Sequence, residues 1–206
     1  MNGTRERILA STTSLMQTHG YAATSVDMIC QATGVTKGAF FHHFESKEAV
    51  AVAALEVFAR EFAESISAAP FMAETDPLAK LWGYLEHAKG MATDPKIAKG
   101  CLVAMFTLER SYHHKPFRDI CAGALGGWTD MVASMIRDVT AAYPPRAAMP
   151  AEELAREFVG LVEGSLIQFK AFGDPTILER NIDHFRRYLN LLLGEPAVVH
   201  RSAANA

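Results

Sequence analysis

The spacing of residues that begin helices is the feature of this sequence that most constrains its fold. Alanine and leucine are frequent, alternating runs of β-branched residues are absent, and three Asp-Pro pairs occur, at residues 76–77, 94–95 and 174–175. An aspartate can cap a helix that begins with proline, because the first turn leaves its N–H groups unpaired in any case. Pro116 and Pro150 precede further segments of helical periodicity. The sequence therefore predicts an all-α protein of about nine helices.

The expected helices form two groups. Three short helices and a connector are expected at the N-terminus, and longer amphipathic helices follow Pro70. We expect a small domain over residues 1–50, a larger helical domain over residues 51–195 and a disordered tail over residues 196–206. The expected helices run over residues 4–20, 25–33, 36–43, 46–67, 76–92, 94–111, 116–143, 150–173 and 174–192, with Thr4 capping the first.

Composition excludes several classes of protein. The 206 residues are half hydrophobic, which is enough for a buried core, and the net charge is -3. That balance argues against a general basic coat, although it leaves room for a local nucleic-acid-binding patch. The three cysteines are far apart and favour neither a disulfide framework nor a zinc site. The start lacks an apolar signal core, and no run approaches the roughly 18 apolar residues of a membrane span. We expect a cytoplasmic protein without membrane association, metal or cofactor.

The stretch "GVTKGAFFHHFESKEAV", from Gly34 to Val50, carries the clearest functional pattern. Two short helices separated by "TGVT", after a longer helix, describe a helix-turn-helix over about residues 27–46. Gly34 suits the turn because glycine tolerates a positive φ. Phe40 and Phe44 are four residues apart, so they share one face of a short helix and can anchor it in the core.

The opposite face of that helix is expected to meet DNA. Small residues at its leading end let the backbone approach the floor of the major groove, and Lys37 can reach a guanine edge or a phosphate. Lys47 lies in the first turn of the next helix, where free amides favour an anion. A metal site at the two adjacent histidines fails on geometry, because neighbouring helical residues point about 100° apart. The outward residues are Lys37, Gly38, Ala39, Phe41, His42 and His43.

These residues also carry a resemblance. The segment "TSVDMICQATGVTKGAFFHHFESKEAV", Thr24 to Val50, resembles the DNA-binding signature of the TetR/AcrR family of bacterial transcriptional repressors, and the agreement extends over about residues 5–55. The resemblance implies that Thr24 and Lys47 contact phosphates, and that His42 and His43 lie along the groove or backbone. The family usually has tyrosine at Phe41, so a phosphate hydrogen bond of about 1 kcal/mol is in doubt here. The residues implied to face bases are Thr36, Lys37, Gly38 and Ala39.

Specific DNA binding by such a short helix requires two copies, spaced by about one turn of DNA or a multiple. A palindromic operator and a homodimer are therefore expected. The last two expected helices carry apolar seams that exceed the needs of one core and predict a four-helix interface, as in the family; packing within one chain is the alternative. The seam residues are Leu154, Phe158, Leu161 and Val162, and Leu178, Ile182, Phe185, Leu189 and Leu192.

The middle of the chain is the expected effector-binding region. Methionine and aromatic residues at helical spacing are individually more often core than pocket, but the family places an effector cavity among these helices. A small molecule that binds there would favour a dimer whose two DNA-binding helices are no longer spaced to fit the operator. The candidate lining residues are Trp82, Met91, Met105, Phe106, Trp128 and Met131.

Cys101 is a candidate sensor of oxidants or electrophiles. It follows Gly100 at an expected helix start, where unpaired amides and the nearby Lys99 would lower the pKa of a thiol. The segments "KGCLVAMFTLE" and "EGSLIQFKAFGDPTILERNIDHFRRYL" resemble a branch of the family that responds to such compounds through cysteine. The resemblance implies that Lys170 lies near the thiol. The alternative is that Cys101 is a packing residue.

We therefore expect a homodimeric, ligand-responsive transcriptional regulator that acts as a repressor. The competing class is a helical enzyme with Glu109, Glu163 and His87 as acid–base groups. Nothing in the sequence brings these three residues together, and no nucleophile, phosphate-loop or metal motif accompanies them.

Overall fold

The computed structural model describes residues 3–94, 97, 99–110, 112 and 114–194. Within these residues there is no strand, so the all-α prediction is confirmed, and no helix is both long and apolar enough to cross a bilayer. The described helices are α1 (Thr4–Ala23), α2 (Val26–Thr33), α3 (Lys37–His43), α4 (Lys47–Ser67), α5 (Pro77–Lys89), α6 (Leu102–Glu109), α7 (Lys115–Ala142), α8 (Ala151–Phe172) and α9 (Thr176–Leu193), with short 3₁₀ helices η1 (Pro70–Ala73) and η2 (Gly90–Ala92).

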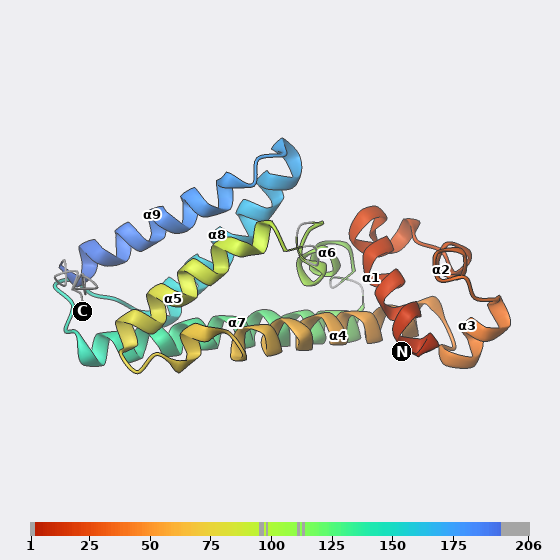
Figure 1. Ribbon diagram of the computed structural model, residues 1–206, viewed down its shortest axis with the longest axis horizontal. Coiled ribbons are helices and arrows are strands. Elements are labelled where there is room, and N and C mark those ends of the chain that lie inside the picture. The colour runs from red at the N-terminus through yellow and green to blue at the C-terminus, as the bar shows by residue number, and fades with distance from the viewer. Residues whose placement is uncertain (1–2, 95–96, 98, 111, 113, 195–206) are drawn as a thin grey trace, which may run out of the picture.

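The helices are arranged along one long axis. Figure 1 shows α1, α2 and α3 gathered at one end, whereas α5, α8 and α9 lie towards the other. Helix α4 leads from the small end into the body, where it packs against α7. It runs unbroken across the domain boundary that was predicted at residue 50. Below, α1 to α3 with the first turn of α4 are called the head.

The predicted cap of α1 is wrong, because Gly3, rather than Thr4, precedes the helix and no side chain caps it. The regular helix is interrupted at Gly20, where it was predicted to end. Gly20 has a non-helical φ of 82°, and a short second helical segment continues to Ala23. The backbone N–H groups that follow this kink are thereby freed for other partners.

The segment before α6 departs further from prediction. The Asp-Pro pair at residues 94–95 was expected to start a helix, but Pro95 lies outside the described residues. Helix α6 begins only at Leu102. Asp94 N–H instead bonds back to the Gly90 carbonyl at 3.1 Å, which closes a turn after η2. Gly100 then has a φ of 111°, so the chain turns again before the helix.

Most of the apolar seam residues of α8 and α9 are buried inside the single chain, and Leu161 and Leu192 are half-buried against the same core. Leu178, Ile182 and Leu189 are fully buried, and the Phe158 and Phe185 rings pack at 5.2 Å between centroids. The prediction that these seams exceed the needs of one core is therefore wrong. Other apolar side chains face outward from the two helices: Ile167, Phe172, Tyr188 and Leu191.

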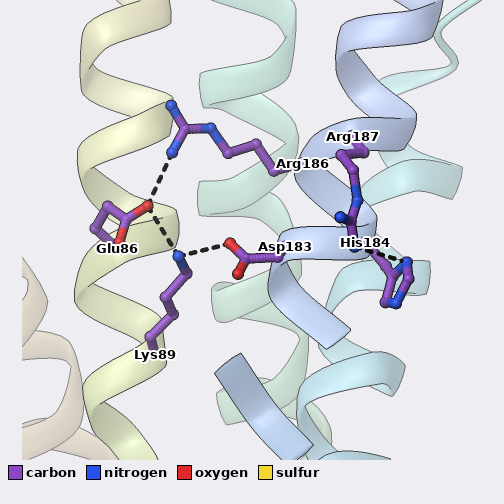
Figure 2. Close-up of polar contacts among 6 residues, drawn as sticks. All are labelled: Glu86, Lys89, Asp183, His184, Arg186 and Arg187. Atoms are coloured by element: carbon purple, nitrogen blue, oxygen red, sulfur yellow. Dashed lines mark hydrogen bonds and ion pairs between the residues drawn. The ribbon is translucent and has the colours of Figure 1, made fainter. Parts of the chain in front are cut away.

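A charged network joins α5 to α9 across the surface of the body (Figure 2). Lys89 Nζ lies 3.0 Å from Glu86 Oε1 and 2.6 Å from Asp183 Oδ1, and Arg186 reaches the same Glu86 oxygen at 2.9 Å. The Arg186 guanidinium also lies 5.0 Å from the centroid of the Trp82 ring. Trp82 is therefore part of this helix–helix contact.

Candidate nucleic-acid interface and effector cavity

The helix-turn-helix is built by local hydrogen bonds. The Ser25 hydroxyl accepts from Met28 N–H at the start of α2, and the Thr36 hydroxyl accepts from Ala39 N–H at the start of α3, at 3.2 and 3.1 Å. Gly34 ends α2 with a φ of 71°. A Cβ atom at Gly34 would meet nothing within 4 Å, so its backbone conformation, rather than crowding, is what favours glycine.

Two phenylalanines hold α3 in place, as predicted. Phe40 is fully buried and Phe44 nearly so, in a cluster that includes Ile8 and Ile29 of the preceding helices. A seven-residue helix is too short to be stable alone, so this packing fixes its orientation. The face left open to solvent carries Thr36, Lys37, Gly38, Phe41 and His42, with Ala39 and His43 half-buried.

Lys37, at the leading end of α3, has a partner in the head. Its Nζ lies 2.7 Å from Asp27 Oδ1, and both side chains are exposed. The hydrogen bond and charge of Asp27 raise the pKa of Lys37, so the ammonium stays protonated at neutral pH. The pair ties Lys37 to α2 at the open face of the head.

Two predicted phosphate contacts point inward instead. Thr24 is fully buried, and its hydroxyl donates to the Gly20 carbonyl at 2.7 Å. Lys47 Nζ donates to the carbonyls of Tyr21, Ala22 and Thr24 at 2.9, 3.3 and 2.9 Å. These contacts use all three ammonium donors, so Lys47 fastens the start of α4 to the end of α1.

Ser25, which follows the buried Thr24, has an exposed hydroxyl. The sequence predicted only that a helix starts at this residue. Ser25 lies at the N-terminus of α2, where the first amides of the helix also face outward. Its position beside Thr24 in the "TS" pair was the signal that could have found it.

Tyr21 connects the head to the body. The Glu109 carboxylate of α6 accepts from Tyr21 N–H at 2.8 Å and Ala22 N–H at 2.7 Å, the groups that the kink in α1 leaves free. The Tyr21 ring packs edge-on against Phe106 and Phe117, with centroids 5.7 and 5.6 Å away. The end of α6 therefore holds the end of α1 through both backbone and ring.

A second contact ties α4 to α7 near this junction. His114 caps α7 by accepting from Phe117 N–H, and its Nε2 lies 2.9 Å from Glu48 Oε1.

The residues of the competing enzyme hypothesis lie apart. Glu109 binds the backbone of α1, whereas His87 packs its ring against Phe71 in the body. The acid–base groups of the competing enzyme hypothesis have separate structural partners.

The body contains a cavity of about 430 Å³ between α4, α6, α7 and α8. Of the predicted effector residues, Met91, Trp128 and Met131 line it. The other three do not: Phe106 packs at the Tyr21 junction, Trp82 lies against Arg186, and Met105 is absent from the lining. The sequence interpretation missed Phe58, Phe62, Met72 and Glu163, although the four-residue spacing of the two phenylalanines on α4 was visible.

Cys101 lines this cavity, but the pKa of its thiol is shifted in the opposite direction to the one predicted. Burial and the neighbouring Glu163 carboxylate raise the pKa of the thiol far above its usual range. Lys99 Nζ bonds to Ser14 Oγ at 2.8 Å, and Lys170 Nζ donates to the Gln17 carbonyl at 3.3 Å. The prediction that the helix start and Lys99 lower the pKa is wrong, because desolvation disfavours the thiolate.

Comparisons with known proteins agree with both parts of the structure. Residues 8–54 match the family described as bacterial regulatory proteins, tetR family, and residues 77–185 match the tetracyclin repressor-like C-terminal domain. The chain belongs to the TetR family. It is a helix-turn-helix DNA-binding transcriptional regulator, and the family is ligand-responsive. Within the described residues, no group of three or more His, Cys, Asp or Glu side chains could hold a metal ion.

Individual relatives cover most of the chain. An HTH-type transcriptional regulator in the lacX 3′ region of Lactococcus lactis subsp. lactis is 27% identical over 89% of this chain and 91% of its own length. The HTH-type transcriptional regulator LmrA of Bacillus subtilis is 26% identical over 79% and 84%.

Solved structures share the fold. A TetR transcriptional regulator from Chloroflexus aurantiacus has a TM-score of 0.81 and 25% identity over 91% of this chain and 94% of its own. The reduced form of E. coli NemR has a TM-score of 0.74 and 20% identity over 92% and 97%, a likeness of fold alone.

Proposed function

We propose that the protein is a homodimeric repressor that binds a palindromic operator and releases it when a small molecule occupies the cavity. The observation that carries this proposal is the position of α6. Val103, near its start, lines the cavity, and Glu109, at its end, holds the α1 backbone. A displacement of α6 by ligand would therefore be transmitted to the head. A ligand that favours the released state by about 100-fold supplies about 2.7 kcal/mol of coupling.

The DNA contacts proposed for the head follow from its open face. Lys37, Gly38 and Phe41 are exposed on α3 and would meet the major groove, with Thr36, Ala39, His42 and His43 beside them. Ser25 and the first amides of α2 are placed to meet a phosphate. Thr24 and Lys47 support this surface from within, through their bonds to the end of α1. A protein with this role acts in the cytoplasm, where the chromosome lies.

The dimer is proposed to form through the outward faces of α8 and α9. Ile167, Phe172 and Leu191 are 59%, 73% and 74% exposed in the single chain, which is unusual for large apolar side chains. Pairing two copies there would cover these side chains and set the distance between the two heads.

Binding to the DNA just upstream of its own gene tests the proposal. Fluorescence anisotropy should show a preference for this duplex over a random one, and the affinity should fall steeply with salt. Leu191→Glu should give a monomer by sedimentation and lose specific binding. Glu179→Gln, an exposed change on the same helix, is the control. Equal affinity for both duplexes at every salt concentration would refute DNA recognition by this protein.

A further inference from the structure

The cavity has a single charged group. Its walls are mostly apolar and aromatic, and Glu163 is the only charged side chain among the described residues that line it. The carboxylate comes from α8, and Cys101, at the start of α6, lies beside it. A carboxylate in such surroundings has lost much of its hydration, which is costly unless a partner replaces the water.

The Glu163 carboxylate is only partly satisfied. Its Oε1 atom is buried and has no hydrogen-bond partner among the described residues. The Cys101 thiol donates a hydrogen bond to the carboxyl group, and burial raises the pKa of Glu163. Glu163, which lines a cavity of about 430 Å³, therefore has one carboxylate oxygen without a partner among the described residues.

The remaining wall suits positive charge. Phe58 and Phe62 of α4 and Trp128 of α7 contribute aromatic rings to the lining. The Trp128 indole N–H already donates to the Tyr84 hydroxyl, so Trp128 offers the cavity its ring rather than a donor. Aromatic rings attract cations through their faces, and this attraction grows when water is excluded.

We propose that the effector of this regulator is a hydrophobic cation whose positive charge lies against the Glu163 carboxylate while its apolar groups contact the aromatic wall. This assignment rests on the proposed function, since it names the class of ligand for the same cavity. Burial raises the pKa of Glu163 in the empty cavity, and a cation beside the carboxylate would lower it again, because an opposite charge stabilises the ionised form. A neutral hydrogen-bond acceptor would instead need Glu163 to stay protonated, and it would gain no cation–π attraction from the rings.

A pair of glycines on α7 leaves room for such a ligand. Gly123 and Gly127 are four residues apart on one face of the helix and both line the cavity. A Cβ atom at either position would meet nothing within 4 Å. Glycine is unfavourable in a helix interior, so the pair lowers local helix stability while keeping this wall open. Both glycines are exposed, so they lie at the open side of the cavity, and a bulky side chain at Gly127 is expected to narrow it there.

The proposal is tested with two probes of matched shape. Methyltriphenylphosphonium is a permanent cation, and triphenylphosphine oxide is a neutral acceptor with the same three rings. Binding to the full-length protein is measured by isothermal titration calorimetry. The cation should bind about 30-fold or more tightly than the oxide, because a buried charge pair is formed only with the cation. Equal binding, or tighter binding of the oxide, would overturn the proposal.

Two pairs of variants locate the probe. Glu163→Gln keeps the shape of the side chain and should remove the preference for the cation, whereas Glu157→Gln, an exposed change on the same helix, should preserve it. Gly127→Leu should block both probes, and Gly126→Leu, which is outside the cavity lining, should not. The glycine pair serves as a test even if Glu163→Gln fails to fold. Unchanged cation affinity in Gly127→Leu would refute this site.

The two proposals can fail separately. If the cation binds through Glu163 but operator DNA stays bound, the ligand class stands and the release mechanism is refuted. If the operator is bound specifically but neither probe binds, the regulator stands and the cationic effector is refuted. Mobility of the operator complex on native gels, with and without methyltriphenylphosphonium, separates these results.

Discussion

The head and the cavity of the body are built in different ways. In the head, Ser25, Thr36 and Ser46 each cap the helix that follows. Lys47 donates hydrogen bonds to backbone carbonyls at the end of α1. In the cavity, helices far apart in sequence meet around unfilled space, and Glu163 keeps an acceptor without a partner. The polar groups named in the head are thus paired, which suits fixed recognition, whereas the cavity lining retains one unsatisfied acceptor, Glu163 Oε1, that a ligand could pair.

The largest expected effect of a single change lies in the small core of the head. Phe40→Ala should lower the free energy of unfolding by about 3–5 kcal/mol, because Phe40 is fully buried beneath α3. Thermal and denaturant unfolding followed by circular dichroism measure this loss. Phe41→Ala is the matched control: its ring is 52% exposed, so stability should change by less than about 1 kcal/mol while DNA affinity falls. Similar losses of stability in both variants would contradict the division of roles.

The next effect distinguishes support of the head from contact with DNA. Lys47→Met keeps the apolar stem but removes the donor to three carbonyls, and should cost about 1.5–3 kcal/mol of stability. If Lys47 acts only within the head, the slope of log affinity against log salt should remain that of the native protein. A slope that becomes shallower by about 0.9 would instead show that Lys47 neutralises a phosphate.

Glycines give opposite predictions in the two regions. Gly34→Ala should destabilise the protein by about 1–2 kcal/mol, because Gly34 has a φ of 71° that residues with a Cβ atom adopt at a cost. Gly127→Ala should stabilise it by about 0.5–1 kcal/mol, because Gly127 is within α7 and faces open space. Denaturant midpoints measured under one set of conditions decide both. A gain at Gly34 or a loss at Gly127 would contradict the stated causes.

The same contrast explains what the sequence could predict. The turn at Gly34, the helix starts at Thr36 and Ser46 and the buried Phe40 follow from rules that act over a few residues, and all are confirmed. Local patterns do not report which distant helices meet. Phe106 was therefore assigned to the cavity although it packs at the head junction, and the seam residues were assigned to a dimer although they lie inside one chain.

The thiol at Cys101 was misjudged for a related reason. A helix start next to Lys99 suggested a lowered pKa, but burial of the thiol raises the pKa, and so does Glu163, which is more than sixty residues away in the sequence. Alkylation of Cys101 by iodoacetamide at neutral pH should be at least about tenfold slower than that of a model thiol, because the thiolate is rare. Mass spectrometry of timed samples measures the rate at this residue. Faster alkylation than the model thiol would restore the redox hypothesis.

The smallest expected effect concerns the exposed pair of Lys37 and Asp27. Exposed ion pairs contribute about 0–1 kcal/mol, so Asp27→Asn should leave the unfolding temperature nearly unchanged. It frees the Lys37 ammonium and removes a negative charge near the DNA, and the affinity for operator and random duplexes should rise by less than about tenfold. Glu45→Gln, an exposed change in the same head, controls for charge alone. A loss of operator affinity in Asp27→Asn, without a loss for random DNA, would show instead that Asp27 positions Lys37 for base recognition.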